Sequence, residues 1–131
     1  MAGAGRLAGL SVFRIEAYSI AMFWTRLDAL IADADVVVDR PKGSLHPRYE
    51  HMIYPLDYGH LLGTTGNDGD PVDVWLGSTA DRFLNAVICT VDLAKKDAEI
   101  KLLLGCTAED KQILLRFHSG DQAGALLVER G

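Results

Sequence analysis

The chain has 131 residues, of which 49% are hydrophobic and 24% are charged, and its formal net charge is −5. This length suffices for about one domain with its own hydrophobic core. Because an acidic surface repels phosphodiesters, we expect no nucleic-acid partner, and a phosphate ligand would need a cation between itself and the carboxylates. No uncharged run approaches the ~18 residues of a membrane span, so we expect no membrane partner either.

The first residues differ in character from those that follow. Arg14 and Glu16 interrupt the stretch that would otherwise form the apolar part of a signal peptide, so we expect no secretion. Cys89 and Cys106 lie in apolar surroundings without a metal-binding spacing, which favours reduced thiols in a cytoplasmic protein. We expect residues 1–21 to be an N-terminal extension, either flexible or due to a start codon placed too early, and residues 22–131 to form the domain.

The first predicted elements are a helix and a strand. Apolar residues recur at helical spacing from Phe23 to Ala34, which predicts a helix with one buried stripe. The β-branched run Val36-Val37-Val38 predicts a short strand. All four prolines and several glycines then fall between residues 41 and 71, so this region is expected to contain turns and short strands only. It also gathers tyrosines, histidines and acids, as expected of an active-site wall.

The rest of the chain alternates apolar runs with turn residues. Five elements are predicted there: strands over 72–76, 84–91 and 99–105, a helix from Thr107 to about His118, and a closing strand over 125–129. Short strands separated by turns and flanked by two helices predict a mainly β fold built as a small closed barrel.

The strongest candidate site is the segment Asp68-Gly69-Asp70-Pro71-Val72-Asp73, called here the Asp-rich segment. Its three carboxylates within six residues repel one another unless a cation neutralises them. Hard oxygen ligands suit Mg²⁺, Mn²⁺ or Ca²⁺. An EF-hand is excluded, because the sixth and twelfth residues from Asp68 are Asp73 and Thr79 instead of glycine and glutamate. A solvated turn remains the alternative on this segment alone.

Further side chains of suitable chemistry lie at strand ends or in loops: Asp92, Asp97, Lys101, Tyr54, Tyr58, Lys42 and Arg48. Metal ions held by such acids can clamp a phosphate and lower the pKa of a bound water. Lysine, arginine and tyrosine can hold the outer phosphate oxygens. Together with the Asp-rich segment, these residues favour a metal-dependent phosphate site over a solvated turn.

Four pieces of the sequence resemble the soluble inorganic pyrophosphatases of the OB-fold type. They are VVVDRPKGS, YPLDYGH, DGDPVDV and the set Asp92, Asp97 and Lys101, and they extend from about Val36 to Lys101. The resemblance implies a small closed five-stranded OB-like barrel with flanking N- and C-terminal helices, in a short form of the family. It also implies Mg²⁺-dependent hydrolysis of pyrophosphate to two phosphates, and a homo-oligomer, since family members commonly assemble.

The resemblance further implies a role for each site residue. Four acids would ligate two or more Mg²⁺ ions, or Mn²⁺ in their place: Asp68, Asp73, Asp92 and Asp97. Asp70 would be the general base toward a metal-bridging water. Asp39 would contact the metal ligands without binding the metal itself. Five residues would bind the substrate: Tyr58, Lys101, Arg48, Tyr54 and Lys42.

The basic side of the implied site departs from the family pattern. Arg48 can fill only one of two places that the family gives to a lysine and an arginine, with Lys42 as a substitute. The Tyr-Lys pair of the family's C-terminal helix has no clear match, and its possible replacements are Lys111, Arg116 and His118. Two alternatives therefore stay open: a hydrolase of another phosphoanhydride, such as a nucleotide, and a non-catalytic module that binds metal or phosphate.

Overall fold

The structure is a computed structural model that describes residues 11–131. Residues 1–10, and with them the first part of the expected extension, lie outside the described residues. By internal contacts the chain divides after Asp33, into one unit up to Asp33 and a second from Ala34 to Gly131. A domain boundary after residue 21 stays a prediction.

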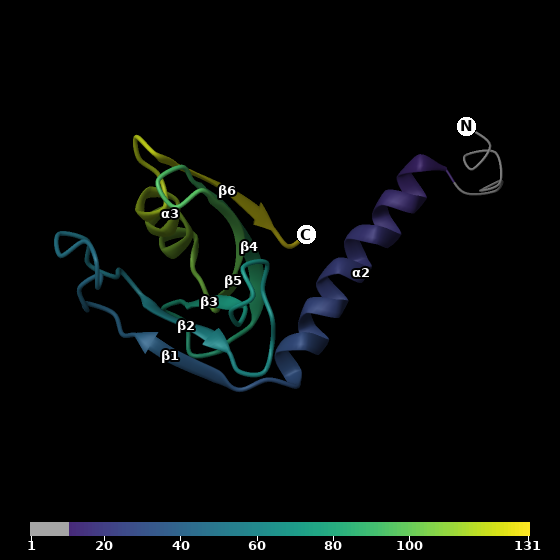
Figure 1. The fold of residues 1–131 in the computed structure, drawn as a ribbon. Helices are drawn as coiled ribbons and strands as arrows, with labels where there is room; N and C mark the ends of the chain where they lie inside the picture. Colours follow the sequence, from purple (N-terminus) through teal and green to yellow (C-terminus); the bar gives the residue numbers. More distant parts are fainter. Residues whose placement is uncertain (1–10) are drawn as a thin grey trace. The chain divides into compact units, whose positions relative to one another are not determined.

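The described part of the first unit is helix α2, Val12–Ala32 (Figure 1). Ser11 caps it, because its side chain accepts a hydrogen bond of 3.1 Å from the N–H of Arg14. The helix predicted from Phe23 is confirmed and begins earlier, since residues 12–32 contain neither glycine nor proline. Of the two described helices, neither is long and apolar enough to cross a membrane.

The second unit is built on a six-stranded sheet with the strand order β1-β2-β3-β5-β4-β6 (Figure 1). Its strands are β1 Val36–Arg40, β2 Asp57–Leu61, β3 Asp73–Leu76, β4 Leu84–Asp92, β5 Asp97–Leu104 and β6 Ala123–Glu129. Neighbouring strands pair antiparallel except β3 and β5, which are parallel. The prediction of a mainly β fold with two helices is therefore confirmed.

A closed five-stranded barrel is not confirmed. The sheet has six strands, and β1 and β6 lie at opposite ends of the strand order, with no pairing between them in residues 34–131. The additional strand, β2, forms inside the region expected to hold turns and short strands. Its Gly59 allows a close approach to β1, because a Cβ at this position would lie 1.9 Å from the carbonyl oxygen of Val37.

Helix α3, Ala108–Phe117, lies between β5 and β6 in the chain and begins where the sequence predicted. Thr107 and Asp110 form a capping box: each side chain accepts a hydrogen bond of 3.0 Å from the backbone N–H of the other. Asp110 also accepts two bonds of 2.8 Å from the N–H and hydroxyl of Ser78, just after β3. The first turn of α3 is thereby tied to the end of β3.

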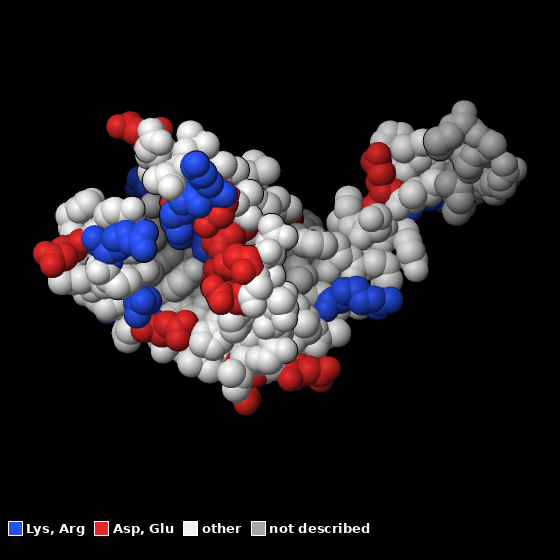
Figure 2. All heavy atoms as spheres, viewed as in Figure 1, with Lys and Arg blue, Asp and Glu red and all other residues white. Residues whose placement is uncertain are grey.

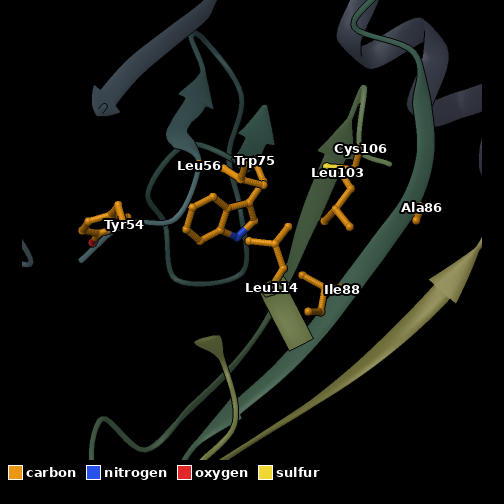
Figure 3. Close-up of a cluster of buried hydrophobic side chains, with 8 residues drawn as sticks. All are labelled: Tyr54, Leu56, Trp75, Ala86, Ile88, Leu103, Cys106 and Leu114. Carbon is orange, nitrogen blue, oxygen red and sulfur yellow. The ribbon is translucent and has the colours of Figure 1, made fainter. Parts of the chain in front are cut away.

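The hydrophobic core lies between one face of the sheet and α3 (Figure 3). Its buried members are Tyr54, Leu56, Trp75, Ala86, Ile88, Leu103, Cys106 and Leu114. Trp75 of β3 and Leu114 of α3 are both fully buried. Burial of a side chain of this size contributes roughly 1.5–3 kcal/mol, so this cluster holds α3 on the sheet face that also carries the polar site.

Candidate active site

Strand β5 carries polar side chains into the apolar face of the sheet. Side chains alternate along a strand, so Asp97, Glu99 and Lys101 share the face of Leu103, which belongs to the core. The intervening Ile100 points to the other face and is 39% exposed. The same face therefore changes along β5 from charged at one end to apolar at the other.

The strands on either side of β5 add acids to this face. In the parallel pairing of β3 and β5, Asp73 is the register partner of Lys101. In the antiparallel pairing of β4 and β5, Asp92 is the partner of Asp97 at the hairpin end. The sheet thus places Asp73 beside Lys101 and Asp92 beside Asp97, which pairs four of the residues that the sequence offered as site candidates.

Lys101 is the centre of a hydrogen-bond network. Its ammonium is 2.8 Å from the hydroxyl of Tyr58, 2.9 Å from Oδ2 of Asp73 and 3.1 Å from Oε1 of Glu99. These three bonds use all three donors of an ammonium group. Lys101 is only 6% exposed, and a buried charge is tolerated when it is paired and hydrogen-bonded in this way.

The charge states within the network follow from burial and from the partners. Burial by itself lowers the pKa of Lys101, but Tyr58 and Asp73 outweigh it, so the pKa of Lys101 is raised and the ammonium stays charged. Burial is the main cause that raises the pKa of Tyr58, so its phenol stays neutral. The network therefore holds a charged ammonium and a neutral hydroxyl beside the side chains of Asp73 and Glu99.

A cleft of about 150 Å³ opens over this network. Figure 2 shows basic and acidic side chains on both sides of a hollow in the sheet-bearing unit. Of the residues predicted as site residues, those that line the cleft are Tyr54, Tyr58, Asp92, Asp97 and Lys101. Sequence reasoning missed Glu99, which also lines it and which the alternation between Asp97 and Lys101 had placed on the same face.

A smaller hollow of about 30 Å³ lies beside the cleft and is lined by Asp68, Asp73 and Glu99, among others. Glu99 lines both hollows and so connects the Asp-rich segment to the cleft. Within the segment, the N–H of Asp70 donates to Oδ1 of Asp68 at 3.0 Å, and both side chains are exposed. Asp70 itself lines neither hollow.

The other predicted residues lie apart from the cleft lining. Lys42 and Arg48 are exposed and line neither hollow. The backbone N–H of Arg48 donates to Nδ1 of His46, which does line the cleft. Asp39 on β1 pairs with Nδ1 of His60 on β2 at 2.8 Å.

The acids around the two hollows offer carboxylate oxygens, which are the ligands that hard divalent cations prefer. In residues 11–131, no three histidine, cysteine or acidic side chains converge closely enough to hold an ion. The ammonium of Lys101 lies between Asp73 and Glu99 and supplies the positive charge there. The chemistry of the donors therefore fits a metal, and binding would require the carboxylates to draw together around it.

His118 follows the last turn of α3 and also lines the cleft. Its Nε2 accepts a hydrogen bond of 3.0 Å from the indole N–H of Trp75. Burial, followed by the charges of Lys101 and Lys95, lowers the pKa of His118 to about 3. The imidazole is therefore neutral at physiological pH, and the sequence had offered it only as one of three replacements for a missing basic pair.

Comparison with known proteins finds a similarity that includes part of this site. Residues 33–93 match the family model described as inorganic pyrophosphatase. This part of the chain is similar to the inorganic pyrophosphatases. The matched range contains Tyr58, the Asp-rich segment and Asp92, whereas Asp97, Glu99, Lys101 and His118 lie beyond it.

Two curated relatives give the extent of the similarity. The inorganic pyrophosphatase of Geobacillus stearothermophilus is 37% identical over 70 residues, which cover 47% of this chain and 41% of that protein. The inorganic pyrophosphatase of Aeropyrum pernix is 41% identical over 51 residues, which cover 39% of this chain and 29% of that protein. The chain thus spans less than half the length of the curated relatives that it matches.

Solved structures with a similar arrangement include an inorganic pyrophosphatase from Helicobacter pylori, with a TM-score of 0.49 and 16% identity. Another is an inorganic phosphatase from Anaplasma phagocytophilum, with a TM-score of 0.49 and 17% identity. Each comparison covers 72% of this chain and 81% of the other.

Proposed function

We propose that this chain is a metal-dependent inorganic diphosphatase that hydrolyses pyrophosphate to two phosphates. The observation that carries the proposal is the network in which Lys101 joins Tyr58 of YPLDYGH to Asp73 of the Asp-rich segment. It unites the two most characteristic pieces of the family resemblance over one cleft. The relatives named inorganic pyrophosphatase support the same reaction.

The size of the cleft favours a small substrate. Its volume of about 150 Å³ is well below the roughly 300–1,000 Å³ of pockets that enclose drug-sized ligands. Pyrophosphate needs less room than a nucleotide, which must also place a sugar and a base. A nucleotide phosphoanhydride is therefore the weaker alternative for this cleft.

For the cofactor we propose two or more Mg²⁺ ions, with Mn²⁺ as a substitute, held by Asp68, Asp73, Asp92 and Asp97. Glu99 is added as a candidate ligand, because it lines both hollows that these acids surround. Bound divalent cations supply positive charge that neutralises the substrate and lowers the pKa of a nearby water. Without such charge, an acidic cleft repels pyrophosphate.

The protein's own residues would bind and orient the substrate. The ammonium of Lys101 can exchange one of its carboxylate partners for a phosphate oxygen, and the neutral phenol of Tyr58 keeps a proton to donate. Tyr54 would support Tyr58, since their rings lie 5.6 Å apart. Arg48 and Lys42 are exposed and would reach substrate only from outside the cleft lining.

We propose Asp70 as the general base. Water attacks one phosphorus, the bridging oxygen leaves with the other phosphate, and the proton passes from water to Asp70 and then to product. Asp70 lies in an exposed turn and lines neither hollow, so its action as the base requires its carboxylate to reach the cleft. Asp39, through its bond to His60, would steady the strand opposite Asp73, because His60 is the register partner of Asp73.

We also propose a cytoplasmic homo-oligomer that binds neither nucleic acid nor membranes. Cys89 and Cys106 are both free, as is usual in a reducing compartment. Exposed apolar side chains such as Leu126, at 63%, and Val91, at 49%, offer surface for association. The net charge of −5 supports the absence of a nucleic-acid partner.

The decisive experiment is phosphate release from pyrophosphate across a Mg²⁺ and Mn²⁺ series, with the wild type compared with Asp70→Asn. We expect metal-dependent release that falls by about 10²-fold or more in the variant, the scale of general-base catalysis. Equal rates would overturn the role of Asp70. Release from nucleoside triphosphates alone would favour the alternative hydrolase, and metal binding without any turnover would indicate a non-catalytic module.

A further inference from the structure

We propose that His118 binds the substrate as an uncharged hydrogen-bond donor, through its Nδ1–H, to an outer phosphate oxygen in the cleft. The identity of that anion rests on the proposed function. The argument for the donor itself rests on the contacts of His118 with Trp75 and on its place in the cleft wall.

The hydrogen bond from Trp75 fixes the tautomer of His118. An indole N–H can only donate, so Nε2 of His118, which lies 3.0 Å from it, must accept and carries no proton. A neutral imidazole then carries its proton on Nδ1. Protonation of Nε2 would set two N–H groups against each other, which agrees with the lowered pKa of His118.

Trp75 also fixes the orientation of the ring. The side chain of Trp75 is completely buried, and its ring centroid lies 4.6 Å from that of Tyr58 and 5.5 Å from that of Phe117. Because this packed indole holds the imidazole, the donor is ordered before the ligand binds, and little side-chain entropy is lost on binding.

Nδ1 of His118 has no acceptor among residues 11–131, and it is not sealed from solvent. In the described part of the chain, the only buried side-chain nitrogen or oxygen without a partner is Oδ1 of Asn85. Nδ1 is therefore accessible, and His118 lines the cleft. A proton donor that is fixed in orientation, unpaired and accessible to solvent, on a residue of the cleft wall, is suited to an anionic ligand.

The charges around His118 mark where such an anion would lie. Lys101 and Lys95 are both close enough to disfavour a positive charge on the imidazole. The same field attracts a phosphate, which would meet two ammonium groups and one neutral donor on this side. The acids Asp92, Asp97 and Glu99 line the cleft as well, so donors and carboxylates both face the ligand.

Two substitutions separate the donor from the structural bond. In His118→Gln, the amide lies near the position of Nε2, so it can still accept from Trp75 but offers no group at Nδ1. In His118→Asn, the amide nitrogen lies near the position of Nδ1 and can replace the donor. His51→Gln, at an exposed histidine that does not line the cleft, is the matched control.

The probe is inorganic phosphate, titrated calorimetrically into the full chain with Mg²⁺ present, alongside steady-state kinetics with pyrophosphate. We expect His118→Gln to weaken phosphate binding about tenfold, as for the loss of a bond to a charged group, and to raise KM more than it lowers kcat. His118→Asn should restore most of the lost binding, and His51→Gln should match the wild type. Unchanged binding in His118→Gln, or no rescue by His118→Asn, would overturn the proposal.

Imidazole nitrogen NMR of the wild type tests the same point without substitutions. We expect the Nδ1–H tautomer of His118, with the Nδ1 resonance shifting on addition of phosphate. An Nε2–H tautomer, or an Nδ1 resonance that ignores phosphate, would overturn the proposal even if both variants fail to fold. Phosphate binding through His118 without pyrophosphate turnover would leave the donor in place and defeat the proposed function instead.

Discussion

The ammonium nitrogen of Lys101 lies 2.9 Å from Oδ2 of Asp73, the acid that closes the Asp-rich segment. The two residues are register partners in the parallel pair of β3 and β5. A lysine therefore neutralises a carboxylate that is also a proposed metal ligand. A metal ion would therefore have to compete with this lysine for Asp73, and the competition can be tested by substitution.

Removal of the lysine charge should destabilise the protein. In Lys101→Met, Asp73 and Glu99 lose their cation, and breaking a buried pair in this way costs about 3–5 kcal/mol. Because the freed carboxylates bind metal better, Mg²⁺ should stabilise this variant more than the wild type against urea. Lys111→Met is the control, since the partner of Lys111, Glu129, is 60% exposed and such a pair is worth about 1 kcal/mol or less. Equal losses in the two variants would contradict the buried-pair assignment.

Substitution of Glu99 should weaken metal binding. Glu99→Gln keeps the shape of the side chain but removes a negative charge from the wall between the two hollows. We expect phosphate release at limiting Mg²⁺ to fall about tenfold and to recover at high Mg²⁺, as for residues that support a metal site. Glu109→Gln, in the exposed first turn of α3, should follow the wild-type Mg²⁺ curve. A uniform loss at all Mg²⁺ concentrations would assign Glu99 to substrate binding instead.

The stability of the protein should fall in mild acid partly through His118. Its pKa is about 3 in the folded state, below the ordinary value of 6.5, so the unfolded chain binds a proton that the folded chain excludes. The contribution of the neutral ring is complete above pH 6.5 and is lost as the pH falls from 6.5 toward 3. The slope from one such proton is at most about 1.4 kcal/mol per pH unit. The free energy of unfolding, measured in urea at pH 7, 6 and 5, should therefore fall more steeply with decreasing pH for the wild type than for His118→Gln. Parallel curves for the two proteins would refute the assignment.

Loss of the Asp110 side chain should destabilise the fold and weaken substrate binding. Asp110→Ala removes a helix cap and the two bonds from Ser78, which together cost about 1–3 kcal/mol. Because His118 directly follows α3, displacement of the helix should also raise the KM for pyrophosphate. Thermal unfolding and kinetics measure the two effects, with Glu109→Ala as the exposed neighbour expected to change stability by about 0.5 kcal/mol or less. A stable variant with wild-type KM would show that α3 is held by the core alone.

Most of the secondary structure after residue 71 could be predicted from the sequence, because its apolar runs, turns and the Thr107 cap are local signals. Strand β2 was not predicted as a separate element, since it depends on Gly59 fitting against β1. The closed barrel was predicted from the succession of short strands and turns, and its five-stranded form from the family resemblance. Closure requires β1 to pair with β6, and a local pattern does not reveal whether the two end strands meet.

Most residues around the cleft were offered as candidates from the sequence, but the contacts between them were not. The contact of Asp73 with Lys101 follows from the parallel register of β3 and β5, and no local pattern reveals which strands are adjacent. Glu99 was overlooked although Asp97 and Lys101 share its alternation. The role of His118 depends on the indole of Trp75, 43 positions away in the chain.

The parallel pairing of β3 and β5 also has a kinetic consequence. Asp73 and Lys101 are 28 positions apart, and β4 must be formed and set on the far side of β5 before their strands can remain together. Contacts of this separation form slowly, since the chain entropy of closing the loop is lost before they stabilise it. On refolding from urea, circular dichroism should therefore recover α3 and the β4–β5 hairpin before phosphate release returns. The catalytic surface would then be the last part of the protein to mature, and a chain stalled before that step would be compact but inactive.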